Sequence, residues 1–379
     1  MTHIHEITDV LARTGAIAID PPVLQPAHLY LEMAGEDLRR RAYLVAEADG
    51  EDLCLRPDMT VPACREALAR GEWANGAAFA LRYEGHVFRR RTDETSGAAQ
   101  FMQAGAEWFF PQAAAPDAAI IVAALEACRA MRVEPALKLG DVGVFTALVD
   151  ACALPAPWGD KLKQGFARPG GAAAVLAQAA APPTETPSAF GQALAQLSEE
   201  RAAEAVAEAL ASARIPPIGG RSVGEIAQRL REKALRALPT KLDGERLALI
   251  RTALAVEGEP DNALARLTRM TRQPGMKLTA FATAVERAAA RWAEVQKLVA
   301  PPAGVRFSLS LGRGLAYYDG FVFELEAAKL GPRAALGGGG RYDGLLHALA
   351  RREKSAPDVS QWGAAGFALR TQRLADARA

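Results

Sequence analysis

The 379-residue sequence predicts an α+β protein whose antiparallel sheet is assembled from both ends of the chain around a helical insertion. Runs that alternate apolar and polar residues, as half-buried antiparallel strands do, occupy the first 112 residues and return at Val305. From Pro116 to about Pro301, apolar residues recur every three or four positions, which is the spacing of helices. The strands at the two ends need one another to complete a sheet. The predicted parts are a core at 1–140 and 301–379 and a helical insertion at 141–300.

The first part of the chain is expected to begin with a short helix and continue with paired strands. The helix ends near Gly15. The run YLVAEADGEDLCL predicts a hairpin around Asp49–Gly50, a dipeptide that tight turns favour. Two longer strands are expected next, AFALRYEGHVFRR from Ala78 and AAQFMQAGAEWFF from Ala98.

The rest of the chain predicts helices first and then a second group of strands. Segments such as DAAIIVAALEACRAM, SEERAAEAVAEALASA and SVGEIAQRLREKALRAL have helical spacing but carry no recognisable motif. Strand-like sequence returns in RFSLSLGRGLAYYDGFVFELEA, followed by ALGGGGRYDGLL, the apolar run WGAAGFAL and a short helix. The glycine-rich segment lacks the Lys-Ser/Thr ending of a P-loop. Four glycines between two strands instead indicate backbone that another group approaches closely.

Composition argues against several classes of protein. A formal net charge of +1 gives no strong field to attract a polyanion, so no nucleic-acid partner is expected. The four cysteines are too few and too scattered for a disulfide framework or a metal site. The five histidines show no pairing with a Ser or Cys nucleophile, which argues against a hydrolase triad. With no signal peptide and no membrane-spanning stretch in the sequence, we expect a cytoplasmic protein with reduced thiols and no cofactor.

Two segments carry candidate binding residues. In FMQAGAE, alternation places Gln103 and Glu107 on one face of a strand, about 13 Å apart along the backbone, with Gly105 leaving space between them. That gap suits a ligand the length of one amino acid, although a solvent-facing polar edge has the same pattern. In GRGLAYYDG, Arg313 can clamp a carboxylate or phosphate. Because adjacent strand residues point to opposite faces, only one of Tyr317 and Tyr318 is expected beside Arg313.

Taken together, these segments occur in the order found in class II aminoacyl-tRNA synthetases and resemble the histidyl-tRNA synthetase core. LRPDMT resembles the Leu-Arg-Pro-Glu-Gly-Thr of that family, and VFRRR followed by QFMQAGAE resembles its motif 2. RGLAYYDGFVFE resembles the histidine-specific signature, GGGGRYDGL is nearly identical to a family segment, and GFALRTQRL resembles motif 3. The resemblance covers roughly 1–140 and 300–379 and implies a class II synthetase-like antiparallel sheet flanked by helices.

The resemblance also implies a pocket for L-histidine. Glu107 and Tyr318 would contact the imidazole, while Asp58 and Gln103 would hold the amino-acid end; Asp58 stands where the family has a glutamate. An imidazole with polar partners on both nitrogens excludes apolar analogues, because binding one would leave buried polar groups unpaired. The full set of predicted histidine-binding residues is Asp58, Gln103, Glu107, Arg313, Tyr317, Tyr318 and Tyr342.

On the ATP side, the resemblance is eroded. Arg91 stands where motif 2 has a glutamate that faces the adenine, and the loop 96–99 reads Ser-Gly-Ala-Ala where the family has Gly-Arg-x-Arg. Adenylation depends on electrostatic stabilisation of developing phosphate charge, so such losses raise its barrier. Arg89 and Arg373 remain at the two core motif arginines. The chain also stops just after motif 3, so no anticodon-binding domain is expected.

A histidine pocket without ATP machinery resembles the regulatory subunit of ATP phosphoribosyltransferase, a synthetase paralogue. That resemblance implies a protein without catalytic residues, a homodimer that joins short-form catalytic subunits in a hetero-oligomer and confers feedback inhibition by histidine on the first step of histidine biosynthesis. Two alternatives stay open at this point. One is an active histidine-activating ligase, and the other is a scaffold in which the pocket is a relic.

Overall fold

The chain divides into two compact units. The first comprises Met1–Leu148, Phe166–Pro169 and Ala253–Ala379, and the second comprises Val149–Gly165 and Gly170–Thr252. The predicted domain limits at residues 140 and 300 stay a prediction. The structure is a computed structural model that describes residues 4–33, 35–46, 52–91, 98–112, 115–155, 158–168, 170–180, 188–213, 222–237, 243–273, 276–312, 314–331, 335–353 and 355–378.

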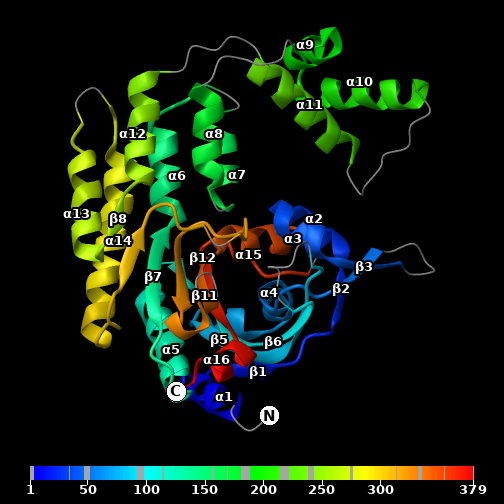
Figure 1. The fold of residues 1–379 in the computed structure, drawn as a ribbon. Helices are drawn as coiled ribbons and strands as arrows, with labels where there is room; N and C mark the ends of the chain where they lie inside the picture. Colours follow the sequence, from blue (N-terminus) through cyan, green and yellow to red (C-terminus); the bar gives the residue numbers. More distant parts are fainter. Residues whose placement is uncertain are drawn as a thin grey trace. The chain divides into compact units, whose positions relative to one another are not determined.

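The first unit is built on a nine-stranded sheet to which both ends of the chain contribute (Figure 1). Its strand order is β1-β5-β6-β12-β11-β10-β7-β9-β8, and only the pairs β1–β5 and β7–β9 are parallel. The predicted antiparallel sheet, built from both ends of the chain, is therefore confirmed. The strands are β1 Ile17–Ile19, β5 Phe79–Phe88, β6 Gln100–Pro111, β7 Ala136–Asp141, β8 Glu257–Gly258, β9 Arg306–Ser308, β10 Phe321–Glu326, β11 Ala335–Arg341 and β12 Trp362–Arg370.

Two strand predictions need correction. The segment 136–141, which lies in the region expected to be helical, is strand β7, because Leu137 and Leu139 alternate toward the core in a run too short to show a helical period. The glycines of ALGGGGR do not connect two strands in the sequence. They form strand β11 itself, which pairs with β10 and β12 in the sheet. The expected close approach is confirmed, since a Cβ on Gly340 would lie 2.9 Å from a ring carbon of Tyr318.

Helices pack on both faces of this sheet (Figure 1). Residues at alternate positions of β6 divide between the faces, as the period of a strand requires. On one face, Phe109 joins a core cluster with Cys64 of α4 and Leu345 of α15. Helices α1 and α5 contact the strands from the other face, and α14 packs against α5. The helices of this unit are α1 Ile4–Arg13, α2 Ala27–Met33, α3 Gly35–Arg41, α4 Thr60–Leu68, α5 Asp117–Ala130, α6 Val142–Ala151 (its first part), α13 Pro260–Met270, α14 Thr279–Leu298, α15 Asp343–Ala350 and α16 Thr371–Ala377.

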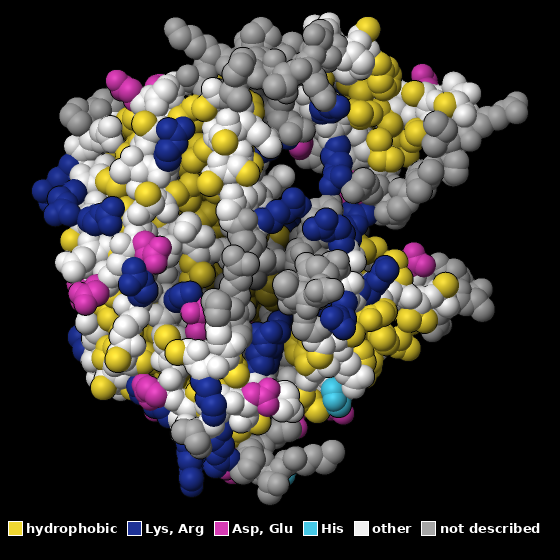
Figure 2. Space-filling model, in the orientation of Figure 1, with side chains coloured by type: hydrophobic (Ala, Val, Ile, Leu, Met, Phe, Trp, Pro, Cys, Tyr) yellow, Lys and Arg dark blue, Asp and Glu magenta, His cyan; other side chains and the backbone are white. Residues whose placement is uncertain are grey.

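A second, three-stranded sheet has the order β2-β4-β3, with β2 Leu24–Pro26, β4 Asp52–Leu55 and β3 Tyr43–Ala46. The antiparallel pairing of β3 with β4 confirms the predicted hairpin, whereas its turn at Asp49–Gly50 lies outside the described residues. Leu24, Leu55 and Tyr43 are direct neighbours across the three strands and share one face. Leu24 is 43% exposed. Hydrophobic side chains reach the surface in the region of β2 and β3 (Figure 2).

The second unit is helical, as the spacing of its apolar residues predicts. It holds most of α7 Trp158–Phe166 and α12 Gly244–Leu254 and the whole of α8 Gly171–Ala180, α9 Ala189–Gln196, α10 Glu199–Ser212 and α11 Val223–Ala237. Helices α9, α10 and α11 enclose a small core of Leu194, Ala202, Val206 and Ala227. Within the described parts of the chain, no helix is long and apolar enough to cross a membrane.

Candidate functional site

Glu107, on the central strand β6, is fully buried and accepts hydrogen bonds from three hydroxyl groups. Thr60 at the start of α4 and Tyr83 on β5 each donate to Oε1 at 2.8 Å. Tyr342, which precedes α15, donates to Oε2. The carboxylate therefore lies where two strands and two helix N-termini converge, on the side of β6 that faces α4.

Burial raises the pKa of Glu107 to about 7, although the hydrogen bonds from Tyr342, Tyr83 and Thr60 oppose that shift. Among the described residues, its recorded partners are hydroxyls rather than cations. A buried carboxylate without a cationic partner is costly in its ionised form. The site is therefore suited to a ligand that brings an N–H donor or a positive charge to Glu107.

The pKa shift predicts a pH-dependent stability for the ligand-free protein. Because the pKa of Glu107 is raised above its unfolded value, its contribution is full below about pH 4 and disappears as the pH rises through 7. Relative to Glu107→Gln, the wild type should lose about 2–3 kcal/mol of unfolding free energy between pH 5 and pH 8. Denaturant unfolding of both proteins at the two pH values checks this. A difference that stays constant with pH would contradict the assigned shift.

Asp58 forms a second buried acidic position in the same unit. It is 3% exposed, and it accepts hydrogen bonds from the backbone N–H of Val61 and the hydroxyl of Tyr317, both at 3.3 Å. Burial raises its pKa, while the positive charge of Arg89 and these hydrogen bonds oppose the shift. Asp58 also lies close enough to Glu107 to raise the pKa of that carboxyl group. The two acids thus belong to one electrostatic site.

Gln103 lies on the same face of β6 as Glu107, because the strand pairs with β5 and β12 without a break in register between the two residues. Its side chain is nearly buried, at 7% exposure, yet its Oε1 has no hydrogen-bond partner among the residues that the structure describes. Buried polar atoms are nearly always paired, so an orphaned acceptor on this face indicates a place for a donor from a ligand or water.

The three predicted tyrosines form one aromatic cluster around the acids. Ring centroids are 4.9 Å apart for Tyr317 and Tyr318, 5.9 Å for Tyr317 and Tyr342, and 6.4 Å for Tyr318 and Tyr342. The expectation that only one of the adjacent tyrosines would share a pocket assumed a strand. It is wrong about the local structure, because residues 316–317 form a turn and both rings join the cluster. The third member of that prediction, Arg313, lies outside the described residues.

The two retained motif arginines have different surroundings. Arg89 donates through Nε to the carbonyl oxygen of Pro57 at 2.7 Å, and its guanidinium lies 5.4 Å from the ring centroid of Phe101. Arg373 donates to the carbonyl oxygen of Ala335 on β11 at 2.8 Å. The guanidinium of Arg370, which is not one of the two motif arginines, lies 4.5 Å from the same ring centroid of Phe101. Of the altered loop 96–99, only residues 98 and 99 are described.

Sequence reasoning did not single out three residues of the site. Thr60 and Tyr83 donate to Glu107, and Gly366 on β12 pairs directly with it. A Cβ on Gly366 would collide with Oε2 of Glu107, so glycine is needed for the carboxylate to rest there. Thr60 ends the LRPDMT segment and Tyr83 alternates into the core of its strand. The role of Gly366 carries no local signal, because it depends on a strand more than 250 residues away.

Comparison with known proteins gives a consistent picture. Residues 2–219 and 206–374 match the family described as histidyl-tRNA synthetase. The chain is 37% identical over 382 residues to an ATP phosphoribosyltransferase regulatory subunit from Sinorhizobium medicae, covering 97% of this chain and 96% of that protein. It is 36% identical to a protein of the same name from Rhizobium meliloti, with coverage of 97% and 95%.

Solved structures confirm the fold. A protein described as an ATP phosphoribosyltransferase regulatory subunit/histidyl-tRNA synthetase from Bacillus halodurans aligns with a TM-score of 0.64 at 19% identity, covering 99% of this chain and 78% of that one. A histidyl-tRNA synthetase from Nostoc aligns with a TM-score of 0.59 at 16% identity, with coverage of 98% and 70%. The chain belongs to the family of ATP phosphoribosyltransferase regulatory subunits, which share the fold of the class II histidyl-tRNA synthetases.

Proposed function

We propose that the protein is a non-catalytic regulatory subunit that binds L-histidine in this pocket and confers feedback control on ATP phosphoribosyltransferase. The observation that carries the proposal is the buried Glu107, which holds three hydroxyl donors and lacks a cation among its recorded partners. An imidazole supplies an N–H donor of the kind this carboxylate lacks. The names of the relatives support the subunit assignment.

The remaining polar groups suit the amino-acid end of the ligand. The α-ammonium would donate to Asp58 and to the orphaned Oε1 of Gln103. Tyr318 would lie against the imidazole within the aromatic cluster. Binding an apolar analogue would leave the buried Glu107 without the N–H donor that an imidazole supplies, which is the basis of strong discrimination.

The proposal assigns no chemistry and no cofactor or nucleic-acid partner to the pocket. Arg91 stands where a synthetase has its adenine-facing glutamate, and Arg373 donates to Ala335 on the neighbouring strand. The second candidate is a histidine-activating ligase. It is favoured by Arg89, a retained motif arginine that lies close enough to the proposed pocket for its charge to oppose the raised pKa of Asp58. Histidine-dependent ATP–pyrophosphate exchange by the purified protein would support the ligase, and its absence at saturating histidine would support the regulator.

A second copy of the chain is the proposed occupant of the apolar face of the small sheet. That face carries Leu24, Tyr43 and Leu55. Two residues further along the strands, and so on the same face, Pro26 and Val45 each pair with Leu53. Leu24 is 43% exposed and the other five side chains are partly exposed, and an apolar face that is left open in this way is typical of an interface. Light scattering should give a molar mass of about twice 40.2 kDa, a dimer, for the wild type and the mass of a single chain for Leu24→Glu. Leu298→Glu, at an exposed position on α14, is the control, and dimers that survive Leu24→Glu would exclude this face.

Reconstitution with a short-form catalytic subunit tests the function. We propose that the complex of the two proteins is cytoplasmic. The two proteins should co-purify, and histidine should inhibit the assembled complex. For that, histidine must bind the less active assembly more tightly, by about 1–3 kcal/mol. A complex whose activity is indifferent to saturating histidine would contradict the proposal.

A further inference from the structure

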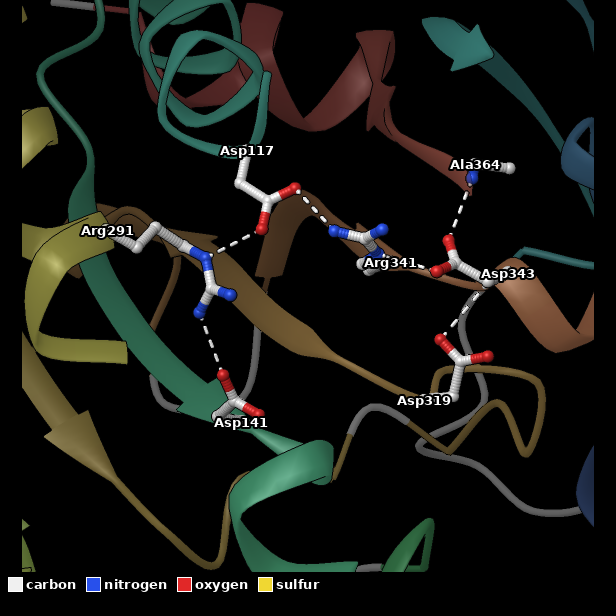
Figure 3. A network of polar contacts seen from close by, with 7 residues as sticks. All are labelled: Asp117, Asp141, Arg291, Asp319, Arg341, Asp343 and Ala364. Carbon is white, nitrogen blue, oxygen red and sulfur yellow. Dashed lines mark hydrogen bonds and ion pairs between the residues drawn. The ribbon is translucent and has the colours of Figure 1, made fainter. Parts of the chain in front are cut away.

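Figure 3 shows a network of charged side chains, carried in part by residues next to the tyrosines of the aromatic cluster in the sequence. Arg291 of α14 donates to Asp117 at 2.9 Å and to Asp141 at 2.8 Å. On the other side of Asp117, Arg341 approaches at 3.5 Å and also donates to Asp343 at 2.8 Å. All of these side chains line one cleft of about 860 Å³ in the first unit.

Two of the clustered tyrosines are direct sequence neighbours of residues in this network. Tyr342 stands between Arg341 and Asp343, and Asp319 follows Tyr318. Because successive side chains at a strand end point to opposite faces, Tyr342 reaches Glu107 while Arg341 reaches the ring of Phe110 on the other face. The pocket and the network are therefore separated by little more than the backbone of these residues.

Asp319 joins the segment that carries Tyr318 to the segment that carries Tyr342. Its backbone N–H donates to the carbonyl oxygen of Arg341 at 3.0 Å. Its carboxylate accepts from the backbone N–H of Asp343 at 3.2 Å and of Gly344 at 2.6 Å, at the start of α15. The position of Tyr318 is thus fixed to the same backbone that carries Tyr342.

Asp343 and Arg341 hold that backbone against the sheet. The Asp343 carboxylate accepts from the N–H of Ala364 at 2.9 Å, while the N–H of Tyr342 donates to the Ala364 carbonyl at 2.8 Å. Arg341 bridges Asp343 to Asp117 at the start of α5. Losing the guanidinium would remove the link from this corner to α5 and, through Asp117, to Arg291 on α14.

We propose that Arg341 and Asp319 are positioning residues for histidine binding, which act through Tyr342 and Tyr318 without touching the ligand. The inference rests on the proposed histidine pocket and adds the residues that set its affinity. It also gives the pocket a connection to α5 and α14 on the opposite face of the sheet. A hydroxyl held at a fixed position makes a stronger contact than one that must be ordered on binding.

A double-mutant cycle on histidine affinity tests this proposal, because only residues that act through one another give non-additive effects. Arg341→Met should weaken histidine binding about tenfold in the wild-type background. In a Tyr342→Phe background, which already lacks the hydroxyl contact to Glu107, the same change should have less than a twofold effect. Arg287→Met is the matched control, since Arg287 lines the same cleft but bonds to Thr283 of its own helix.

The outcomes separate the inference from the proposed function. Tenfold losses in both backgrounds, or no loss in either, would overturn the positioning role while leaving the histidine pocket intact. If the wild type itself binds no histidine, the proposed function fails. Should Arg341→Met not fold, Asp319→Asn takes its place in the cycle, with the same non-additivity expected for its removal of one acceptor at α15.

Discussion

Glu107→Gln is expected to weaken histidine binding by at least about thirtyfold. The amide keeps the size of the side chain but removes the charge that faces the ligand N–H, in a site that excludes water. Hydrogen bonds to a buried charge are worth about twice those between neutral groups. Removing one partner of such a pair costs about 2–5 kcal/mol, because the other is left buried and unpaired.

Calorimetric titration of the variant with L-histidine measures this loss. Glu126→Gln, at an exposed position on α5, is the matched control and should bind as the wild type does. Thermal unfolding without ligand shows that each protein is folded. An affinity for Glu107→Gln within a few-fold of the wild type would place the imidazole elsewhere.

Gly366→Ala is expected to displace the carboxylate of Glu107 from its position against β12. The added Cβ would collide with the carbonyl oxygen of Ala106, which is fixed by the pairing of β6 with β12, and with Oε2 of Glu107, which would have to leave its hydroxyl donors. Overpacking of this kind costs about 1–3 kcal/mol of unfolding free energy. Because the displaced group is Glu107, histidine affinity should fall about tenfold as well.

Denaturant unfolding and histidine titration together check this second expectation. Gly71→Ala is its control, since a Cβ there would meet no atom of the described residues within 4 Å. Equal stability and affinity for Gly366→Ala and the wild type would show that Glu107 does not rest on β12. A loss of stability without a loss of affinity would separate the packing of the strand from the pocket.

The sequence was sufficient for the features that depend on local pattern. Strand alternation put Gln103 and Glu107 on one face, and the structure keeps them there. The order of the motifs predicted the sheet shared by both chain ends, which the pairing of β6 with β12 confirms. These predictions succeed because the period of a strand and the order of segments are visible in the sequence itself.

The features that failed or were missed depend on contacts between distant segments. Tyr317 and Tyr318 face the same cluster because a turn, rather than a strand, carries them. Gly366 matters only because Glu107 pairs with it across two strands. The pairing of Arg341 with Asp117 joins residues more than 200 positions apart, for which a single sequence contains no signal. The histidine-binding roles themselves stay a prediction.

The most direct measurement is a calorimetric titration of the ligand-free wild-type protein with L-histidine at neutral pH. If side chains from β6, α4 and the two tyrosine-bearing segments enclose one free amino acid, binding should saturate at one histidine per chain. Leucine, which has no N–H to offer the buried carboxylate, should give no heat. A protein that binds no histidine at millimolar concentration, or that binds leucine equally well, would contradict the assignment of this pocket to L-histidine.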